Sequence, residues 1–185
     1  QWIKEHPIVY FGYEPNWPPY EMYKDGAYTG IIGDYIKVIE EQTGIDMIPM
    51  PPVKWSETVK KLNTGEIKVV PAMGISAKRK ERFVFTTPYI MDPLVVVTRD
   101  NFKVIEGISD LKGKTITLPE GYNRIELINR DYPSIKIVPA EDVQDCLLLV
   151  STSKADAFVG SLSVVSYYVN KFGFSNLKIA APTDY

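Results

Sequence analysis

The residue in this chain with the clearest chemical meaning is Arg79, which lies within the stretch 69–100, VVPAMGISAKRKERFVFTTPYIMDPLVVVTRD. The stretch reads as an apolar strand ending at Gly74, a polar loop, an aromatic anchor and a second apolar strand. At Gly74 the missing side chain lets a ligand approach the backbone closely. A guanidinium is always charged and offers a fork of donors, so Arg79 suits a carboxylate better than a lysine would. The alternative is a solvated basic turn formed by Arg79, the adjacent lysines and Arg82.

A second group of candidates lies in the proline-rich segment 14–21, EPNWPPYE. This segment is predicted to be irregular, because each proline fixes φ and lacks a donor. Glu14, Trp17 and Tyr20 supply a carboxylate and two aromatic faces, which either line a ligand site or form a hydrophobic lid. Trp55 presents a similar choice between stacking on a ligand and packing on the start of its own helix.

A third candidate is the turn PEGYN, which joins a strand predicted at 114–118 to a helix. Such a turn leaves N–H groups without partners at the start of the helix. The sequence therefore predicts an anion site at Gly121, Tyr122 and Asn123. The alternative is a plain connection between strand and helix.

Composition excludes several classes of function. The chain has 185 residues, 45% hydrophobic and 24% charged, which is enough for one core or for two small lobes. Its net charge of -2 provides no clustered basic excess, so we expect no nucleic-acid partner.

Single copies of histidine (His6) and cysteine (Cys146) exclude a Ser-His-Asp arrangement and a metal site, and no glycine loop for a cofactor phosphate is present. We therefore expect no metal and no cofactor, and we expect Cys146 to be a buried structural thiol. No stretch approaches the about 20 apolar residues of a membrane span. The chain also opens without a signal-peptide pattern, so targeting segments are expected to be removed or to lie outside it.

Short apolar runs alternate with amphipathic periods, which is typical of an α/β fold. Strands are predicted at 8–12, 47–50, 94–98, 114–118, 135–138, 157–160 and 177–180. The β-branched run at 94–98 predicts a strand buried on both faces. Glycines 44, 65 and 173 are predicted to end helices in the left-handed conformation.

The string SAKRK followed by FVFTTPY resembles the TPERK and F-[ST]-x-P-Y signature of the family 3 bacterial extracellular solute-binding proteins. Further segments are similar to that family in its order and spacing. They are WPPYE at 17–21, YTGIIGDYIKVIEEQTG at 28–44, W-S-E-T-V-x-x-L-x-x-G at 55–65, DLKGKTITLPEG at 110–121 and ADAFVG at 155–160. The resemblance covers nearly the whole chain.

The resemblance implies a two-lobed fold of the type II periplasmic-binding-protein kind, with lobe one at 1–92, lobe two at 93–185 and a ligand cleft between them. The lobes are expected to close over a small ligand. Relatives return to lobe one with a further strand and helix, and this segment is expected to be missing from the chain shown.

On lobe one, the family's carboxylate-binding arginine corresponds to Arg79. The family's main-chain and hydroxyl contacts correspond to Ala72 and Gly74, where the threonine often found at the latter position is absent. The family's aromatic walls correspond to Trp17 and Trp55.

On lobe two, the resemblance places the anion cradle at the 121–123 segment. It also places Ser161 where amino-acid binders carry an aspartate that pairs with the ligand's ammonium group. Serine cannot supply that charge, so either Glu14 substitutes or the ligand is not an ordinary α-amino acid. Small organic acids or modified amino acids are therefore expected. Ser161 or Ser163 can also cap the last helix.

The phrases VVPAMGISAKR and ADAFVGSLSVVSYY are similar to the kinase-linked branch of the family. The resemblance implies a periplasmic sensor domain tethered to the inner membrane, with transmembrane and histidine kinase domains in cis and a homodimer as a further expectation. The alternative is a free periplasmic carrier that delivers solute to an ABC permease. A third class, a dehydratase-like enzyme using Glu14, Glu21 and Glu120, is the least favoured, and this domain is expected not to be an enzyme.

Overall fold

The computed structural model describes residues 2–183 and 185, and it divides into two compact units. Unit 1 is Gln1–Thr86 and unit 2 is Thr87–Tyr185. Each unit combines helices with β-sheet, which confirms the α/β class predicted from the alternating pattern.

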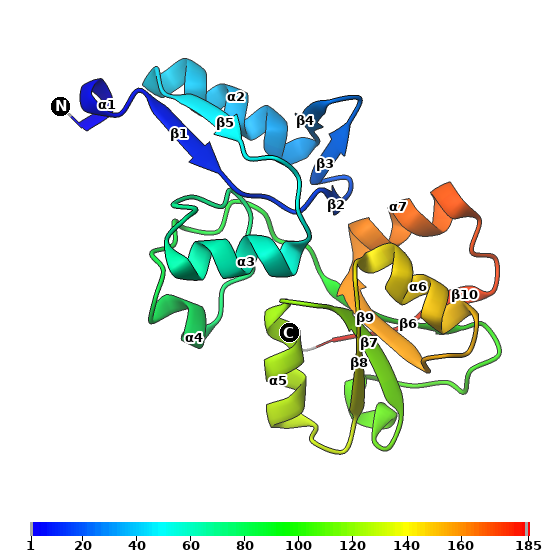
Figure 1. The fold of residues 1–185 in the computed structure, drawn as a ribbon. Helices are drawn as coiled ribbons and strands as arrows, with labels where there is room; N and C mark the ends of the chain where they lie inside the picture. The colour runs from blue at the N-terminus through cyan, green and yellow to red at the C-terminus, as the bar shows by residue number, and fades with distance from the viewer. Residues whose placement is uncertain (1, 184) are drawn as a thin grey trace. The chain divides into compact units, whose positions relative to one another are not determined.

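Unit 1 holds two small sheets and four helices among its described residues (Figure 1). One sheet pairs β1 (Ile8–Phe11) in parallel with β5 (Asp46–Pro49). The other is antiparallel and contains β2 (Asn16–Trp17), β3 (Glu21–Lys24) and β4 (Ala27–Thr29). The helices are α1 (Trp2–Glu5), α2 (Ile31–Thr43), α3 (Trp55–Thr64) and α4 (Ala77–Lys80).

The small antiparallel sheet was not predicted from the sequence. Its hairpin turns at Asp25 and Gly26, whose φ angles are 53° and 81°. Two successive residues with positive φ are what a type I′ turn requires, and the dipeptide Asp-Gly is a recognised signal for it. The irregular segment predicted at 14–21 is thus replaced in part by β2 and the start of β3.

The strand predicted from Val69 to Gly74 is wrong. Val69 forms only an isolated parallel bridge with Phe11, and its carbonyl accepts the Gly12 N–H at 3.0 Å. Beyond it, Pro71 cannot donate to a ladder, and a glycine in a strand contributes no side chain to pack.

The start of α2 anchors the proline-rich segment of unit 1. The N–H groups of Ile31 and Ile32 donate to the carbonyls of Pro19 and Tyr20 at 3.1 Å and 3.0 Å. Gly30 allows this approach, because its φ is 110° and a Cβ there would lie 2.3 Å from the Tyr20 carbonyl oxygen. The segment carrying Trp17 and Tyr20 is therefore held by backbone bonds.

Unit 2 contains a five-stranded sheet in the order β10-β6-β9-β7-β8. Its strands are β6 (Leu94–Arg99), β7 (Thr115–Pro119), β8 (Lys136–Ala140), β9 (Ala157–Ser161) and β10 (Leu177–Pro182). The helices are η1 (Ile108–Leu111), α5 (Asn123–Asp131), α6 (Val143–Ser151) and α7 (Leu162–Phe172). These strands lie close to the ranges predicted from the sequence.

Strand directions in unit 2 bring several loops to one edge of the sheet. β7, β8 and β9 run parallel and lead into α5, α6 and α7. β6 runs antiparallel to β9, with Leu94 opposite Ser161, so β6 begins at the place where β9 ends. We call this place the carboxyl edge. It is formed by the residues that precede β6 and by those that follow β7, β8 and β9.

The core of unit 2 is apolar. The central residues of β6 and all of β9 are buried, as predicted for the 94–98 run. Phe158 and Leu147 are fully buried. Cys146 is buried as well, and the Thr117 hydroxyl donates to its sulfur at 3.5 Å, so the prediction of a structural thiol is confirmed.

The three glycine stops are confirmed by φ angles of 71° at Gly44, 76° at Gly65 and 66° at Gly173. The division into units falls between Thr86 and Thr87, six residues before the lobe boundary predicted at 92/93. Hydrogen bonds from the start of α7 to Asp92 and to the Pro93 carbonyl tie these two residues to unit 2.

Candidate functional site

Glu21 is the most deeply buried charged-type side chain near the proline-rich segment, with 0% of its surface exposed. The Glu14 backbone N–H donates to Glu21 Oε2 at 3.1 Å, and the Tyr28 hydroxyl donates to Oε1 at 2.9 Å. Burial raises the pKa of Glu21 to about 8, and these two hydrogen bonds oppose the rise. A carboxyl group enclosed in this way holds its own unit together and is out of reach of a substrate, which weakens the enzyme interpretation.

Glu14 is itself buried, with 6% of its surface exposed. The residue before it, Tyr13, has its ring close to the rings of Phe11, Tyr23 and Tyr28. The ring centroids of Tyr13 and Tyr28 are 4.7 Å apart. Burial and the nearby Tyr23 and Glu21 raise the pKa of Tyr13. Phe11, Tyr13 and the two carboxyl groups are buried in this cluster, and Tyr23 lies at its exposed margin.

The three aromatic candidates differ in exposure. Tyr20 and Trp55 are buried, each with 6% of its surface exposed. Trp55 is the first residue of α3, where it fits the packing alternative. Trp17 is half-buried and lies with its ring centroid 4.6 Å from that of Tyr20. Trp17 therefore remains the best placed of the three to face a ligand.

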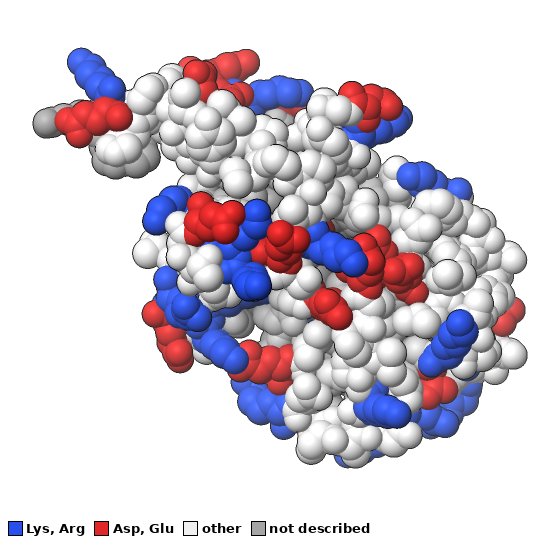
Figure 2. All heavy atoms as spheres, in the orientation of Figure 1, with Lys and Arg blue, Asp and Glu red and all other residues white. Residues whose placement is uncertain are grey.

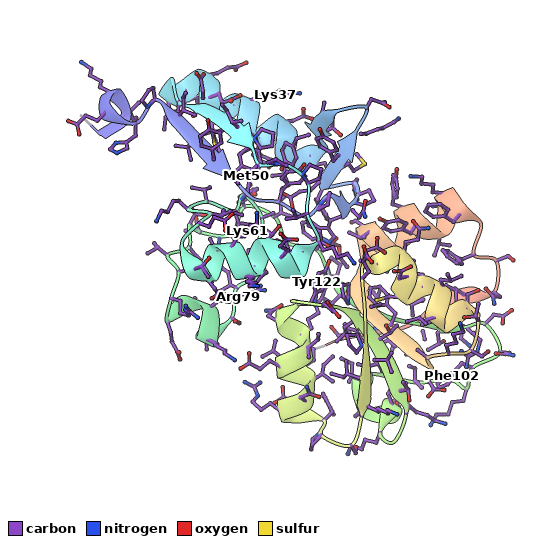
Figure 3. The ribbon with its side chains drawn as sticks, viewed as in Figure 1. Lys37, Met50, Lys61, Arg79, Phe102 and Tyr122 are labelled. Carbon is purple, nitrogen blue, oxygen red and sulfur yellow. The ribbon has the colours of Figure 1, made fainter. Side chains whose placement is uncertain are left out.

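Arg79 lies in the short helix α4 rather than in the loop predicted from the sequence. The Ser76 side chain caps this helix by accepting the Arg79 backbone N–H at 3.3 Å. Arg79 Nη1 donates to the Gly74 carbonyl at 2.8 Å, so the guanidinium folds back over the segment that precedes it (Figure 3). The first bond holds the backbone of Arg79, and the second orients its guanidinium.

The other basic residue of this segment, Arg82, is exposed, as expected of a solvated position. Its Nη2 donates to the Asn63 carbonyl at 3.2 Å and so joins the segment after α4 to α3. Of the two main-chain candidates, Ala72 is half-buried and Gly74 is exposed. The Gly74 carbonyl that a ligand was expected to approach is already bonded to Arg79.

At the carboxyl edge of unit 2, Gly121 turns the chain from β7 into α5 with a φ of 81°. The prediction that the Tyr122 N–H lacks a partner is wrong, because it donates to the Pro119 carbonyl at 3.3 Å. The Arg124 guanidinium lies over the Tyr122 ring, 5.2 Å from its centroid. Asn123 begins α5, and the side chain of the N-cap residue Tyr122 makes no cap hydrogen bond.

Ser161 ends β9 with 5% of its surface exposed. It stands at the N-cap position of α7, yet its side chain does not cap that helix, and no cap from Ser163 is seen either. Its hydroxyl instead donates to Asp92 Oδ2, and the Ser163 backbone N–H donates to Asp92 Oδ1 at 3.4 Å. Asp92 was not predicted from the sequence. The sequence feature that could have pointed to Asp92 is its position as an acidic residue immediately before Pro93 and the buried strand β6.

Figure 2 shows basic and acidic side chains interspersed over the visible face. Within residues 2–183 and 185, no group of three or more His, Cys, Asp or Glu side chains is arranged to hold a metal ion. In the same part of the chain, no helix is both long enough and apolar enough to cross a membrane.

These observations describe two α/β units, each with buried polar side chains that are hydrogen-bonded within the unit. The chain belongs to the bacterial extracellular solute-binding proteins, family 3, because its sequence matches that family over residues 9–171. Within this family it is similar to the virulence sensor protein BvgS of Bordetella pertussis, with 29% identity over 185 residues. That match covers 100% of this chain and 15% of BvgS, so the chain spans a small part of the relative.

Two solved structures agree with the assignment. The crystal structure of the B. pertussis BvgS periplasmic VFT2 domain matches with a TM-score of 0.86 and 29% identity, over 100% of this chain and 79% of that chain. The arginine-bound form of truncated ArgBP from T. maritima matches with a TM-score of 0.83 and 26% identity, over 97% of this chain and 84% of that one. The periplasmic-binding-protein-like fold is therefore confirmed, and a sensor domain and an amino-acid binder are both similar to this chain.

Proposed function

We propose that this chain is a periplasmic sensing domain that binds a small carboxylate-bearing molecule and serves a membrane-bound sensor histidine kinase. The match to BvgS, a sensor protein by name, extends over the whole chain and supports the sensing role. The family description supports a place outside the cytoplasm and a small-molecule ligand.

The orientation of Arg79 is the observation that carries this proposal. A guanidinium has five N–H donors in a planar fork, which matches the two oxygens of a carboxylate. The bond from Nη1 to the Gly74 carbonyl orients that fork before a ligand arrives, and the Ser76 cap holds the backbone from which the side chain extends. A donor that is already oriented loses less conformational freedom on binding, so affinity is gained.

In unit 2, the proposed second contact is the start of α5, where backbone N–H groups and the helix dipole favour a negative group. Gly121, Tyr122 and Asn123 form this turn, although the Tyr122 amide is bonded within it. Trp17 is proposed as the aromatic wall in unit 1. Closure of the two lobes on the ligand stays a prediction from the family.

A free carrier for an ABC permease is the second candidate, and the similarity to arginine-bound ArgBP supports it. Both roles require the same ligand chemistry. They differ in the response of the whole protein, because only a sensor changes the phosphorylation of a kinase when its ligand binds.

The ligand proposal is tested by a thermal-shift screen of carboxylates against neutral analogues of the same size. A ligand present at 100 times its Kd should stabilise the protein by about 2.7 kcal/mol. At least one carboxylate should raise Tm, and its amide should not. A library in which only neutral compounds raise Tm would contradict the proposal.

The sensing proposal needs the whole protein in its membrane. The carboxylate found in the screen should change autophosphorylation of the kinase, and Arg79→Ala should abolish that response. Ligand-dependent uptake of the carboxylate with no change in phosphorylation would favour the carrier instead.

A further inference from the structure

Glu21 is the first residue of β3, and its side chain reaches back to the beginning of the proline-rich segment. In the register of the hairpin, Glu21 lies opposite Trp17 of β2. Its Oε2 accepts the backbone N–H of Glu14 at 3.1 Å. One fully buried side chain therefore joins the two ends of the segment that carries Trp17.

The segment 14–20 has few backbone donors with which to hold its own shape. Three of its seven residues are prolines, which carry no N–H group. Its far half is held by main-chain bonds to the start of α2. At the near end, the amide of the buried Glu14 donates to the Glu21 carboxyl group. A buried N–H that loses its acceptor is unfavourable, so this side-chain bond fixes where the segment begins.

The titratable groups that face Glu21 supply no positive charge. The Tyr28 hydroxyl of β4 donates to Oε1 at 2.9 Å. Tyr13 and Tyr23 are the next titratable neighbours, and the Glu14 side chain is buried in the same segment. These groups are neutral or acidic, so the carboxyl group is held by hydrogen bonds alone.

The helix packed against the hairpin adds no charge to this enclosure. Lys37 of α2 pairs with Asp34 at 2.9 Å on the exposed side of the helix. Within the described part of the chain, no lysine or arginine forms a hydrogen bond or an ion pair with the Glu21 carboxyl group. The buried residues of α2 are uncharged, namely Ile32, Gly33 and Ile36.

Ionisation of this carboxyl group should open the segment. Two neutral donors are few for a carboxylate removed from water, and burial raises the pKa of Glu21 to about 8. The stabilising contribution of the protonated form is fully present below pH 4.5 and is lost as the pH rises through 8. Above that pH the carboxylate is better solvated by water, which reaches it only when the segment moves away.

We propose that Glu21 is a positioning residue that closes the segment 14–20 and thereby sets the place of Trp17. The inference rests on the proposed function, in which Trp17 is the aromatic wall in unit 1, and it adds a regulation of that site. Glu21 acts through the Glu14 amide rather than by touching the ligand. Because a site that is only partly closed binds with reduced apparent affinity, binding should weaken as the pH rises into the alkaline range.

Fluorine NMR of the protein labelled with fluorotryptophan reads the surroundings of Trp17 without a ligand. The Trp17 signal, identified by its absence from Trp17→Phe, should titrate with a midpoint near pH 8. The signal of the buried Trp55 should stay in place. Circular dichroism should show that the fold is kept at pH 9.

Three variants separate positioning from a general effect on stability. Glu21→Gln cannot ionise, so its Trp17 signal should not titrate. Tyr28→Phe removes a bond that lowers the pKa of Glu21, so the midpoint should move to higher pH. Glu41→Gln, at an exposed position of α2, is the matched control and should titrate like the wild type.

Calorimetry then connects the place of Trp17 to binding. The probes are acetate, lactate and trimethylglycine, whose charges stay constant between pH 6 and pH 9. Any probe that binds should bind the wild type at least about fivefold more weakly at pH 9 than at pH 6. In Glu21→Gln the difference should fall below about twofold, because a neutral amide keeps the segment closed at both pH values.

The other outcomes reject the inference and can be told apart. A Trp17 signal that stays in place up to pH 9, or that moves equally in Glu21→Gln, shows that Glu21 does not position Trp17. A signal that titrates while the Kd of a bound probe stays constant shows that Trp17 lies outside the ligand site. If no probe binds at either pH, the carboxylate specificity of the proposed function fails, and the fluorine titration alone decides whether Glu21 positions Trp17.

Discussion

The two units of this chain hold their polar groups in different ways. Unit 2 has a five-stranded sheet with an apolar interior, and its polar side chains are gathered at one edge. Unit 1 has two small sheets and encloses a carboxyl group, Glu21, among tyrosine rings. The stability of unit 2 should therefore depend on packing volume, and the stability of unit 1 on protonation.

The largest expected effect tests the apolar side of this comparison. Phe158 lies in β9, at the centre of the sheet of unit 2, and 0% of its surface is exposed. Replacing a buried phenylalanine with alanine leaves a cavity and typically costs about 3–5 kcal/mol. Phe158→Ala should lower the urea midpoint accordingly at every pH. Val84→Ala, at a fully exposed position, is the control and should change stability by less than about 0.5 kcal/mol.

The second prediction concerns the buried carboxyl group of unit 1. The pKa of Glu21 is raised from its usual 4.5 to about 8, so the folded state favours the protonated form. Its contribution to stability is fully present below pH 4.5 and is lost as the pH rises through 8. At about 1.4 kcal/mol per pKa unit, the loss amounts to a few kcal/mol.

Glu21→Gln mimics the protonated form, so the variant should lack this loss. Wild type and variant should be similar near pH 5, and the variant should be the more stable at pH 9. Glu41→Gln, at an exposed position of α2, should follow the wild type throughout. Parallel stability curves for wild type and Glu21→Gln across this range would remove the contrast between the units.

The smallest effect compares two helix caps with the same chemistry. Asp142 caps α6 by accepting the Asp145 N–H at 2.9 Å, and Ser76 caps α4 by accepting the Arg79 N–H at 3.3 Å. Loss of a cap typically costs about 1 kcal/mol. Asp142→Ala should lower the stability of the protein by that amount, because α6 packs on the sheet of unit 2. Ser76→Ala should weaken ligand binding more than stability, because α4 has only four residues and carries Arg79.

The same contrast explains which parts of the fold could be predicted from the sequence. The strands of unit 2 are buried apolar runs, so periodicity located β6, β7 and β9 closely. Unit 1 is built from short strands and prolines, where patterns are weak, and the hairpin at Asp25 and Gly26 was missed although its turn dipeptide is present. The strand expected from Val69 to Gly74 was wrong, because Pro71 in this run cannot donate to a ladder and the apolar pattern was weighted above it.

The candidate site was predicted unevenly for a related reason. Arg79 was singled out by the chemistry of its guanidinium and by the resemblance of its segment, and Ser161 by the resemblance alone; the roles of both residues stay predictions. The contact between Asp92 and Ser161 was missed, because it arises from the register between β6 and β9, two strands far apart along the chain. The bond of the Tyr122 amide to Pro119 was also missed, since a tight turn can satisfy an N–H that a helix leaves open.

Calorimetry on Arg79 variants tests the central claim most directly, with the carboxylate that gives the largest thermal shift as the titrant. Removing one partner of a buried, hydrogen-bonded ion pair typically costs about 2–5 kcal/mol, so Arg79→Ala should weaken binding by more than about thirtyfold. Arg79→Lys should recover only part of the loss, because an ammonium lacks the planar fork. Arg82→Ala should bind like the wild type, and all three variants should stay folded. If Arg79→Ala binds as tightly as the wild type, the segment is only a basic turn and the account of the ligand site is wrong.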